Sequence, residues 1–264
     1  KVVRDMVGRS ITEYYPGRTN EPGEIVLEVK NFCQEGLFNN ISFKLRKGEI
    51  LGVAGLMGAG RTEIMRALFG VDSCKHGEVY LHGKKVCIKK PEDAIKAGIG
   101  FITENRKSEG LILDFSISRN IALPSVDTFA KRSVINAKNE TAFSEALSKK
   151  LGVKTASIDL EAGALSGGNQ QKVIFGKWLE REPQVFMMDE PTRGIDVGAK
   201  YEIYELIIKM AKQGKTVIVV SSEMPEILGI TNRIGVMSNG HLSGIVNTKE
   251  TNQEELLRLS AKYL

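Results

Sequence analysis

Short apolar segments, separated by turns rich in glycine, proline and charge, recur along this chain of 264 residues. Apolar runs this short are typical of strands buried in a parallel sheet. We expect such strands at Ile50–Ala54, Ile99–Thr103, Val185–Met188 and Lys215–Ser221. Because open α/β sheets bind ligands at the carboxyl ends of their strands, the loops after these segments are the first candidates for a site.

Other segments predict helices and outer strands. A helix expected at 138–151 has an apolar stripe of Phe143, Ala146, Leu147 and Leu151. A helix expected at 199–210 turns inward the apolar residues Tyr201, Tyr204, Ile207, Ile208 and Ala211. Further helices are expected at 61–69, 91–97, 116–123 and 253–262, and one more after Gly168, ending near Trp178. Further strands are expected at 24–30, 41–45, 78–81, 85–88, 233–237 and 242–246. The elements as a whole predict an α/β fold.

Composition removes several functional classes. The net charge is +5, but aromatic residues make up only 6% and do not interleave with basic runs, so a nucleic-acid surface is not expected. The three cysteines include no Cys-x-x-Cys pair and predict reduced thiols, and the three histidines do not cluster into a zinc site. Since no apolar run approaches the length of a membrane span, we expect a cytoplasmic chain.

A phosphate-binding loop is predicted at Gly55–Thr62, which reads GLMGAGRT after an apolar strand. The spacing of Gly, four residues, Gly, a cation and Thr is that of the phosphate loop. Backbone N–H groups of Gly58, Ala59, Gly60, Arg61 and Thr62 should cradle a β-phosphate, and the Thr62 hydroxyl should bind Mg²⁺. The cation is Arg61 instead of the usual lysine, and its bulky planar fork should place a γ-phosphate poorly.

A second anion site is indicated at Leu165–Lys172, which reads LSGGNQQK ahead of a helix. The glycines allow close backbone approach, the first turn offers unpaired N–H groups, the helix dipole adds positive charge, and Ser166 supplies a hydroxyl. A flexible helix cap is the alternative for these residues alone.

Two adjacent carboxylates, Asp189 and Glu190, end the apolar run Val185–Met188 within VFMMDEPTRGID. Asp189 should hold Mg²⁺ through its water shell, and Glu190 should polarise an attacking water; a helix N-cap is the structural alternative. Together with the phosphate loop and LSGG, this motif resembles the ATP-binding cassette (ABC) ATPases. The resemblance implies an ABC-type P-loop NTPase cassette with a RecA-like core, a small antiparallel β subdomain and a helical subdomain.

The resemblance implies further site residues. ATP would be bound by Gly55, Gly58, Ala59, Gly60, Arg61, Thr62 and Glu63; Mg²⁺ by Thr62, Glu104 and Asp189; and catalysis would use Glu190 and Ser222. The signature Leu165, Ser166, Gly167, Gly168 and Gln170 would act in trans on a partner cassette, and Asp196 would lie in the loop that crosses to it.

Besides Arg61 in place of lysine, three features depart from the family pattern. Glu104 replaces a glutamine that ligates Mg²⁺, and Ser222, in SSEMPE, replaces a histidine that contacts the γ-phosphate. An aromatic residue that stacks on adenine is not evident, because Phe32 and Phe38 fit core positions better. We therefore expect a site that binds ATP and hydrolyses it poorly, in a chain whose intact signature completes the partner's site.

The whole chain resembles the second cassette of tandem monosaccharide importer ATPases. Residues 1–23 would be a linker from a preceding cassette and 24–264 the ATPase domain, with 24–104 and 181–264 forming the core and 105–180 the helical subdomain. The tail looks most like galactose/methyl-galactoside importers, with ribose or xylose importers as the alternative.

The partners implied by this resemblance are an N-terminal cassette on the same polypeptide, permease subunits and, indirectly, a sugar-binding protein. The chain would lie peripherally on the cytoplasmic face of the membrane without touching the sugar. A non-hydrolysing regulatory nucleotide-binding domain stays open as the alternative function, favoured by Arg61 and Ser222.

Overall fold

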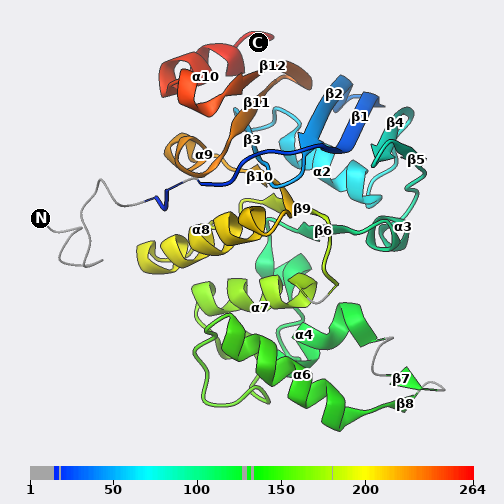
Figure 1. Ribbon diagram of the computed structural model, residues 1–264, viewed down its shortest axis with the longest axis vertical. Helices are drawn as coiled ribbons and strands as arrows, with labels where there is room; N and C mark the ends of the chain where they lie inside the picture. Colours follow the sequence, from blue (N-terminus) through cyan, green and yellow to red (C-terminus); the bar gives the residue numbers. More distant parts are fainter. Residues whose placement is uncertain (1–14, 18, 127–129, 132–133, 180) are drawn as a thin grey trace, which may run out of the picture. The chain divides into compact units, whose positions relative to one another are not determined.

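The computed structural model describes residues 15–17, 19–126, 130–131, 134–179 and 181–264, and these form two compact units (Figure 1). The first unit contains the described residues up to Phe101 together with Gln184–Glu190 and Tyr204–Leu264. The second contains those of Ile102–Pro183 and Pro191–Ile203. The chain therefore leaves the first unit and returns to it twice.

A six-stranded sheet forms the centre of the first unit, in the order β12-β11-β3-β10-β9-β6. Its strands are β3 (Ile50–Gly55), β6 (Ile99–Ile102), β9 (Val185–Asp189), β10 (Thr216–Val220), β11 (Arg233–Ser238) and β12 (His241–Asn247). Strand β10 pairs in parallel with both β3 and β9, and β12 turns back antiparallel on β11. The four apolar runs expected to form buried strands are confirmed as β3, β6, β9 and β10.

Helices cover both faces of this sheet, which explains why β9 and β10 are buried at every position. Leu51 and Val53 of β3 line an apolar cavity with side chains of α2 (Arg61–Phe69). Position 52 of β3 lies on the face of the sheet away from α2, because successive positions along a strand alternate between faces. A Cβ at Gly52 would lie 2.8 Å from Ile227 of α9 (Met224–Ile230), so α9 packs directly on the backbone.

A separate antiparallel sheet of the first unit has the order β2-β1-β4-β5. The strands are β1 (Ile25–Gln34), β2 (Phe38–Arg46), β4 (His76–Leu81) and β5 (Lys84–Val86). The turn Glu35–Leu37 joins β1 to β2, and Asn39 donates its backbone N–H to Gly240 O in the β11–β12 turn at 2.8 Å. This contact fixes the β1–β2 turn to the edge of the central sheet.

The second unit is mainly helical. It contains α4 (Ile117–Ala122), α6 (Ala137–Lys150) and α7 (Gly167–Leu179), with short turns η2 (Arg106–Gly110), η3 (Leu123–Ser125) and η4 (Ala162–Ala164) and a hairpin of β7 (Ala130–Lys131) and β8 (Val134–Ile135). The three helices lie together in Figure 1. The expected stripe of α6 is partly wrong: Ala146 is exposed, and Ser144 and Ser148 are buried beside Leu147. Ser144 can be buried because its hydroxyl donates to Ser118 O at 3.1 Å.

The remaining elements are α3 (Pro91–Lys96), α8 (Val197–Lys212), η5 (Thr248–Glu250) and α10 (Gln253–Ser260). Helix α9, the π-helical turn η2 and the β7–β8 hairpin are not among the elements predicted from the sequence. Each is short and carries little periodic signal, although Pro225 marks the first turn of α9. Across the described part of the chain, every helix is too short or too polar to cross a bilayer.

A buried carboxylate ties the two sheets together. Glu49 is fully buried and accepts hydrogen bonds from Arg233 Nε at 2.5 Å and from the backbone N–H of Arg46 at 2.7 Å. Arg233 also donates to Lys44 O in β2 at 2.7 Å. Because Arg233 begins β11, this pair joins the β2 end of the antiparallel sheet to the central sheet.

Removing the Arg233 side chain should therefore destabilise the folded chain. Arg233→Ala should lower the free energy of unfolding, measured by urea denaturation, by about 3 kcal/mol, since it leaves a buried charge unpaired. Arg258→Ala, at an exposed position on α10, is the control and should change it by less than about 0.5 kcal/mol. Equal stabilities of the two variants would show that the Glu49 pair does not hold the sheets together.

Candidate functional site

The loop between β3 and α2 has the shape of an anion cradle. Gly58 and Gly60 have φ values of 77° and 95°, in the left-handed region that favours glycine, and a Cβ at Gly58 would meet open space. Gly60 caps α2 without any side-chain hydrogen bond, so the first-turn N–H groups point into the loop. Ala59 N–H donates to Leu56 O at 3.1 Å and closes the loop. The arrangement can bind phosphate through backbone N–H groups and the dipole of α2.

Asp189 ends β9 next to this loop and is the deepest charged group of the site. It is fully buried, and neither carboxylate oxygen receives a hydrogen bond of standard geometry from the described residues. Burial raises the pKa of Asp189 to about 6; the Thr62 hydroxyl beside it lowers the pKa, and the charge of Glu190 raises it. Two buried oxygens without partners are what a hard cation or its water shell would satisfy.

Thr62 and Asp189 therefore fit a Mg²⁺ site. No group of three His, Cys, Asp or Glu side chains able to hold a metal occurs within the described residues, so phosphate oxygens and water would have to complete the shell. Glu104, the third expected ligand, belongs to the second unit, where its carboxylate pairs with Arg193.

Glu190 follows Asp189 in a strained backbone conformation. Its φ is 46°, uncommon for a residue with a side chain, and its N–H donates to Val220 O at 2.9 Å. The side chain is only 9% exposed. Burial raises the pKa of Glu190, and a hydrogen bond from Ser222 lowers it. Strain held by a sheet edge is common at functional residues, and a carboxylate with a raised pKa suits a general base.

Arg61 lies across this carboxylate. Its Nη1 donates to Ser221 O at 3.0 Å and lies 3.9 Å from Glu190 Oε1, and its side chain is 13% exposed. The structure thus brings Glu190, the expected base, together with Arg61 and Ser222, two residues that depart from the family pattern. In this state, the guanidinium faces the sheet edge and the carboxylate.

The signature segment lies in the second unit at the start of α7. Ser166 is exposed, and its hydroxyl accepts from Asn169 Nδ2 at 3.0 Å. A Cβ at Gly168 would lie 2.6 Å from Ala199 Cβ, and one at Gly167 would lie 3.2 Å from Gly194 O. The glycines thus let α7 begin directly against the loop that precedes α8, a reason for them that the sequence did not suggest.

Other members of the expected set have structural contacts within this unit. Gln170 is buried and donates to Ala162 O at 3.3 Å, and Leu165 is half-buried. Asp196 is exposed and accepts the N–H of Ala199 at 2.9 Å, so it caps α8. Gln170 is therefore placed to hold the signature segment, while Ser166 and Asp196 face solvent.

Two arginines in this unit were not singled out from the sequence. Arg106 donates to Arg193 O at 2.5 Å and to Gly194 O at 3.2 Å, and Arg193 itself pairs with Glu104. The two arginines and Glu104 thus join the segment after β6 to the loop before α8. Lone arginines in charged loops give no sequence signal for such a cluster.

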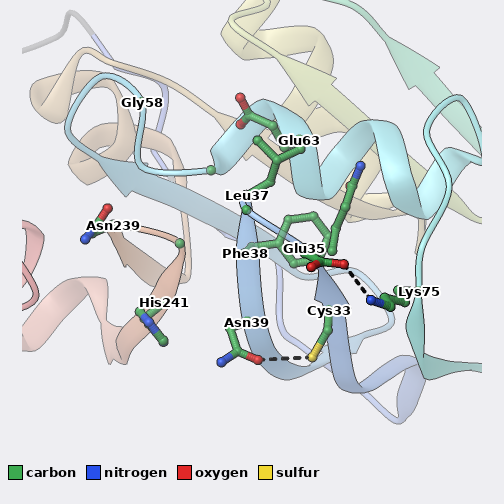
Figure 2. Close-up of a pocket in the computed structure, with 14 residues that line it drawn as sticks. Cys33, Glu35, Leu37, Phe38, Asn39, Gly58, Glu63, Lys75, Asn239 and His241 are labelled. Atoms are coloured by element: carbon green, nitrogen blue, oxygen red, sulfur yellow. Dashed lines mark hydrogen bonds and ion pairs between the residues drawn. The ribbon is translucent and has the colours of Figure 1, made fainter.

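A cavity of about 420 Å³ opens beside the phosphate loop (Figure 2). It is lined by Gly58, Gly60 and Glu63, by the β1–β2 turn, and by Asn239, Gly240 and His241 of the β11–β12 turn. Phe32 and Phe38 are both buried, with ring centroids 5.6 Å apart, which confirms that they are core residues. Phe38 lines the cavity, but only 3% of its surface is exposed.

The phosphate loop, the paired carboxylates and the signature segment define a class of protein, the nucleotide-binding cassettes of ABC systems. A sequence model of the ABC transporter family matches residues 38–193, and the chain belongs to that family. The fold agrees. The ATP-binding cassette MJ1267 of an ABC transporter superposes with a TM-score of 0.77 at 20% identity, covering 90% of this chain and 99% of MJ1267. The bacterial cassette MJ0796, solved as a dimer, superposes with a TM-score of 0.71 at 21% identity, covering 84% of this chain and 98% of MJ0796.

Relatives at higher identity carry a more specific name. The ribose import ATP-binding protein RbsA of Bacillus subtilis is 53% identical over 260 residues, covering 98% of this chain and 53% of RbsA. The protein of the same name from Oceanobacillus iheyensis is 52% identical over 257 residues, covering 97% and 52%. The chain thus spans about half the length of the curated relatives it matches.

The raised pKa of Asp189 makes a stability prediction. Between about pH 4 and pH 6 the native state binds more protons than the unfolded state, so stability falls as the pH rises through this window. Asp189→Asn should remove this loss of stability with rising pH. Without nucleotide or Mg²⁺, its free energy of unfolding should exceed that of the parent chain at pH 7.5 by on the order of 1–3 kcal/mol.

The difference should shrink steadily as the pH is lowered from about 6 toward 4, because the native state is then protonated at Asp189 and no longer carries a buried charge. Asp114→Asn, an exposed aspartate of the second unit, is the matched control and should show no such trend in urea denaturation. A variant no more stable than the parent at pH 7.5 would contradict this account of the Asp189 charge.

Proposed function

We propose that this chain is a nucleotide-binding domain that binds MgATP and energises import of a monosaccharide through an ABC transporter. The observation that carries the proposal is the buried Asp189 carboxylate, which receives no hydrogen bond of standard geometry and lies beside Thr62 at the edge of a phosphate loop. A cation with its phosphate ligands would satisfy those oxygens, and Mg²⁺, when bound, supplies charge neutralisation at the phosphates.

In this proposal the chain's own residues have separate duties. The N–H groups of the Gly58–Thr62 segment bind the β-phosphate, and Thr62 and Asp189 hold the cation, with Glu104 as a further ligand once its pair with Arg193 opens. Glu190 orients the attacking water and accepts its proton. Ser222 donates to that carboxylate and so competes for the lone pairs that the water would use.

We infer that the hydrolysis step is weak at this site. Arg61 lies 3.9 Å from the Glu190 carboxylate and donates to Ser221 O, so it neutralises the base and points its charge away from a loop-bound phosphate. The signature, with Ser166 exposed at the start of α7, would serve the partner cassette. The second candidate, a regulatory domain that binds nucleotide without hydrolysing it, is favoured by this same contact.

The proposed sugar is taken from the names of the relatives. The proteins named above are called ribose import ATP-binding proteins, so ribose-type import replaces the galactose expectation, which draws no support from them. The relatives are about twice as long as this chain, which leaves room for another cassette, and we propose that this chain is the second of the two. The proposed partners are the first cassette, the permease subunits and, through them, a sugar-binding protein, with the whole held at the cytoplasmic face of the membrane.

Binding and turnover measured together test the proposal. The 264-residue chain should bind ATP in the presence of Mg²⁺ and release phosphate slowly, at a rate that Glu190→Gln lowers at least tenfold without weakening binding. Thr62→Ala, which removes the hydroxyl beside Asp189, should weaken Mg²⁺-dependent binding. Absence of any MgATP binding would refute the proposal, whereas binding with no release above that of Glu190→Gln would support the regulatory candidate.

The inferred asymmetry is tested by restoring the family residues. Arg61→Lys together with Ser222→His should raise phosphate release by at least tenfold, because a compact ammonium fits between phosphates and an imidazole reaches the γ-phosphate. Arg66→Lys is the matched control for the arginine change, since Arg66 lies on α2 but pairs with Asp72. Turnover that does not rise in the double variant would count against the inference.

A further inference from the structure

The first residues that the structure describes are docked on the ATPase core, which the expected division into a linker and a domain does not account for. We call residues 15–17 and 19–23 the strap. In Figure 1 the strap runs past α8 and α9 to β1. The buried Asn20 side chain donates to Gly48 O at 2.8 Å and to Asn232 Oδ1 at 2.7 Å. The strap is therefore part of the fold of the first unit.

Tyr15 begins the strap with a close contact to α9. A Cβ at Gly229, in the last turn of α9, would lie 2.3 Å from Tyr15 Cγ, so the phenol ring rests directly on the helix backbone. The ring centroid also lies 5.4 Å from that of Tyr204, a fully buried residue of α8. Any side chain at Gly229 would displace the Tyr15 ring. Tyr15 thus joins the strap to both helices.

Helix α9 in turn holds the loop that follows β10. Glu226 is fully buried in the first turn of α9 and accepts a hydrogen bond from the Ser221 hydroxyl. The carbonyl oxygen of Ser221 accepts from Arg61 Nη1 at 3.0 Å. Ser222, the next residue of the loop, donates to the Glu190 carboxylate. The two groups that lie against the expected base are therefore positioned by the loop that Glu226 anchors.

We propose that Tyr15 is a positioning residue whose docking on α9 restrains hydrolysis at the phosphate loop. This inference rests on the proposed binding and hydrolysis of MgATP there. With the strap docked, α9 and the loop after β10 keep Arg61 and Ser222 on the Glu190 carboxylate, which makes it a poor base. When the Tyr15 ring leaves Gly229, α9 loses one of its contacts and these two groups can move off Glu190.

Helix α9 can transmit such a change because it is short and is held from two sides. Its seven residues are too few for a stable isolated helix, so packing decides its position. Ile227 packs on the backbone of β3 at Gly52. Gly229, two positions further along, lies about 200° round the helix and receives the Tyr15 ring. Loss of the ring frees one side of α9 while the sheet retains the other, so α9 shifts without unfolding.

The position of the strap gives this contact a use. In the proposed tandem protein, the chain before Tyr15 leads to the preceding cassette. A movement of that cassette that lifts Tyr15 from α9 would release the restraint on Glu190. The strap would thus couple the position of one cassette to turnover in the other.

The test measures ATP binding and phosphate release of the 264-residue chain with Mg²⁺, together with thermal unfolding. Tyr15→Ala and Gly229→Ala should each raise phosphate release about threefold to tenfold, since each takes the ring off α9. Gly229→Ala should not weaken α9 itself, because alanine favours a helix more than glycine does. Tyr15→Phe keeps the ring and should release phosphate as the parent chain does.

A double-mutant cycle tests whether the two residues act through one contact. In the Tyr15→Ala background, Gly229→Ala should change phosphate release by less than about twofold, because the ring it displaces is already absent. Tyr263→Ala, at a 42% exposed tyrosine near the end of the chain, is the matched control for loss of a ring and should leave release unchanged.

The outcomes separate this inference from the proposed function. If Tyr15 were purely structural, Tyr15→Ala would lower the unfolding temperature and phosphate release together, and that result would overturn the inference. Release that is unchanged in both single variants, or raised in only one of them, while MgATP still binds would overturn it as well. If the parent chain does not bind MgATP, the proposed function fails first.

Discussion

The site depends on the register of three parallel strands. Val220, the last residue of β10, pairs with Asp189, the last residue of β9, and with Val53 of β3, so β9 and β10 end at the same level beside the loop that follows β3. The groups that follow are then held by the sheet itself: Glu190 N–H donates to Val220 O, and Ser221 O accepts from Arg61. A shift of one residue in β9 would turn Asp189 to the other face of the sheet. Two carboxylates and a guanidinium can be crowded here only because the backbone ladder fixes them.

That crowding explains the unusual electrostatics of the site. Asp189 is buried and receives no hydrogen bond of standard geometry from the described residues, Glu190 has a left-handed backbone, and Arg61 is mostly buried between Glu190 and Ser221. Each of these features costs stability in the nucleotide-free chain. Bound phosphates and a cation would relieve the Asp189 cost directly. The site is thus destabilised locally by the same groups that suit it to bind a charged ligand.

The sequence predicted the central sheet well because its strands are short apolar runs followed by punctuating polar residues, as at Val185–Met188 and Thr216–Val220. It also predicted α2 with the observed bounds, since Gly60 and Gly70 flank it. It missed α9, whose seven residues are too few for a periodic signal, and it misassigned Ala146, because Ser144 and Ser148 take buried positions through backbone hydrogen bonding and packing. Residues that act through position and not through motif, such as Arg106 and Arg193, have no signature that a single sequence can reveal.

The contact between Gly168 and Ala199 has a mechanical consequence. With no side chain at Gly168, α7 begins so close to the start of α8 that nothing can slide between them, and Asp196 caps α8 three residues before that contact. Ser166 at the start of α7 and Asp196 at the start of α8, both exposed, are therefore held by the same helix contact. A displacement of the loop before α8 would therefore displace Ser166 as well, and a partner bound at Ser166 or Asp196 would be coupled to the position of the other residue.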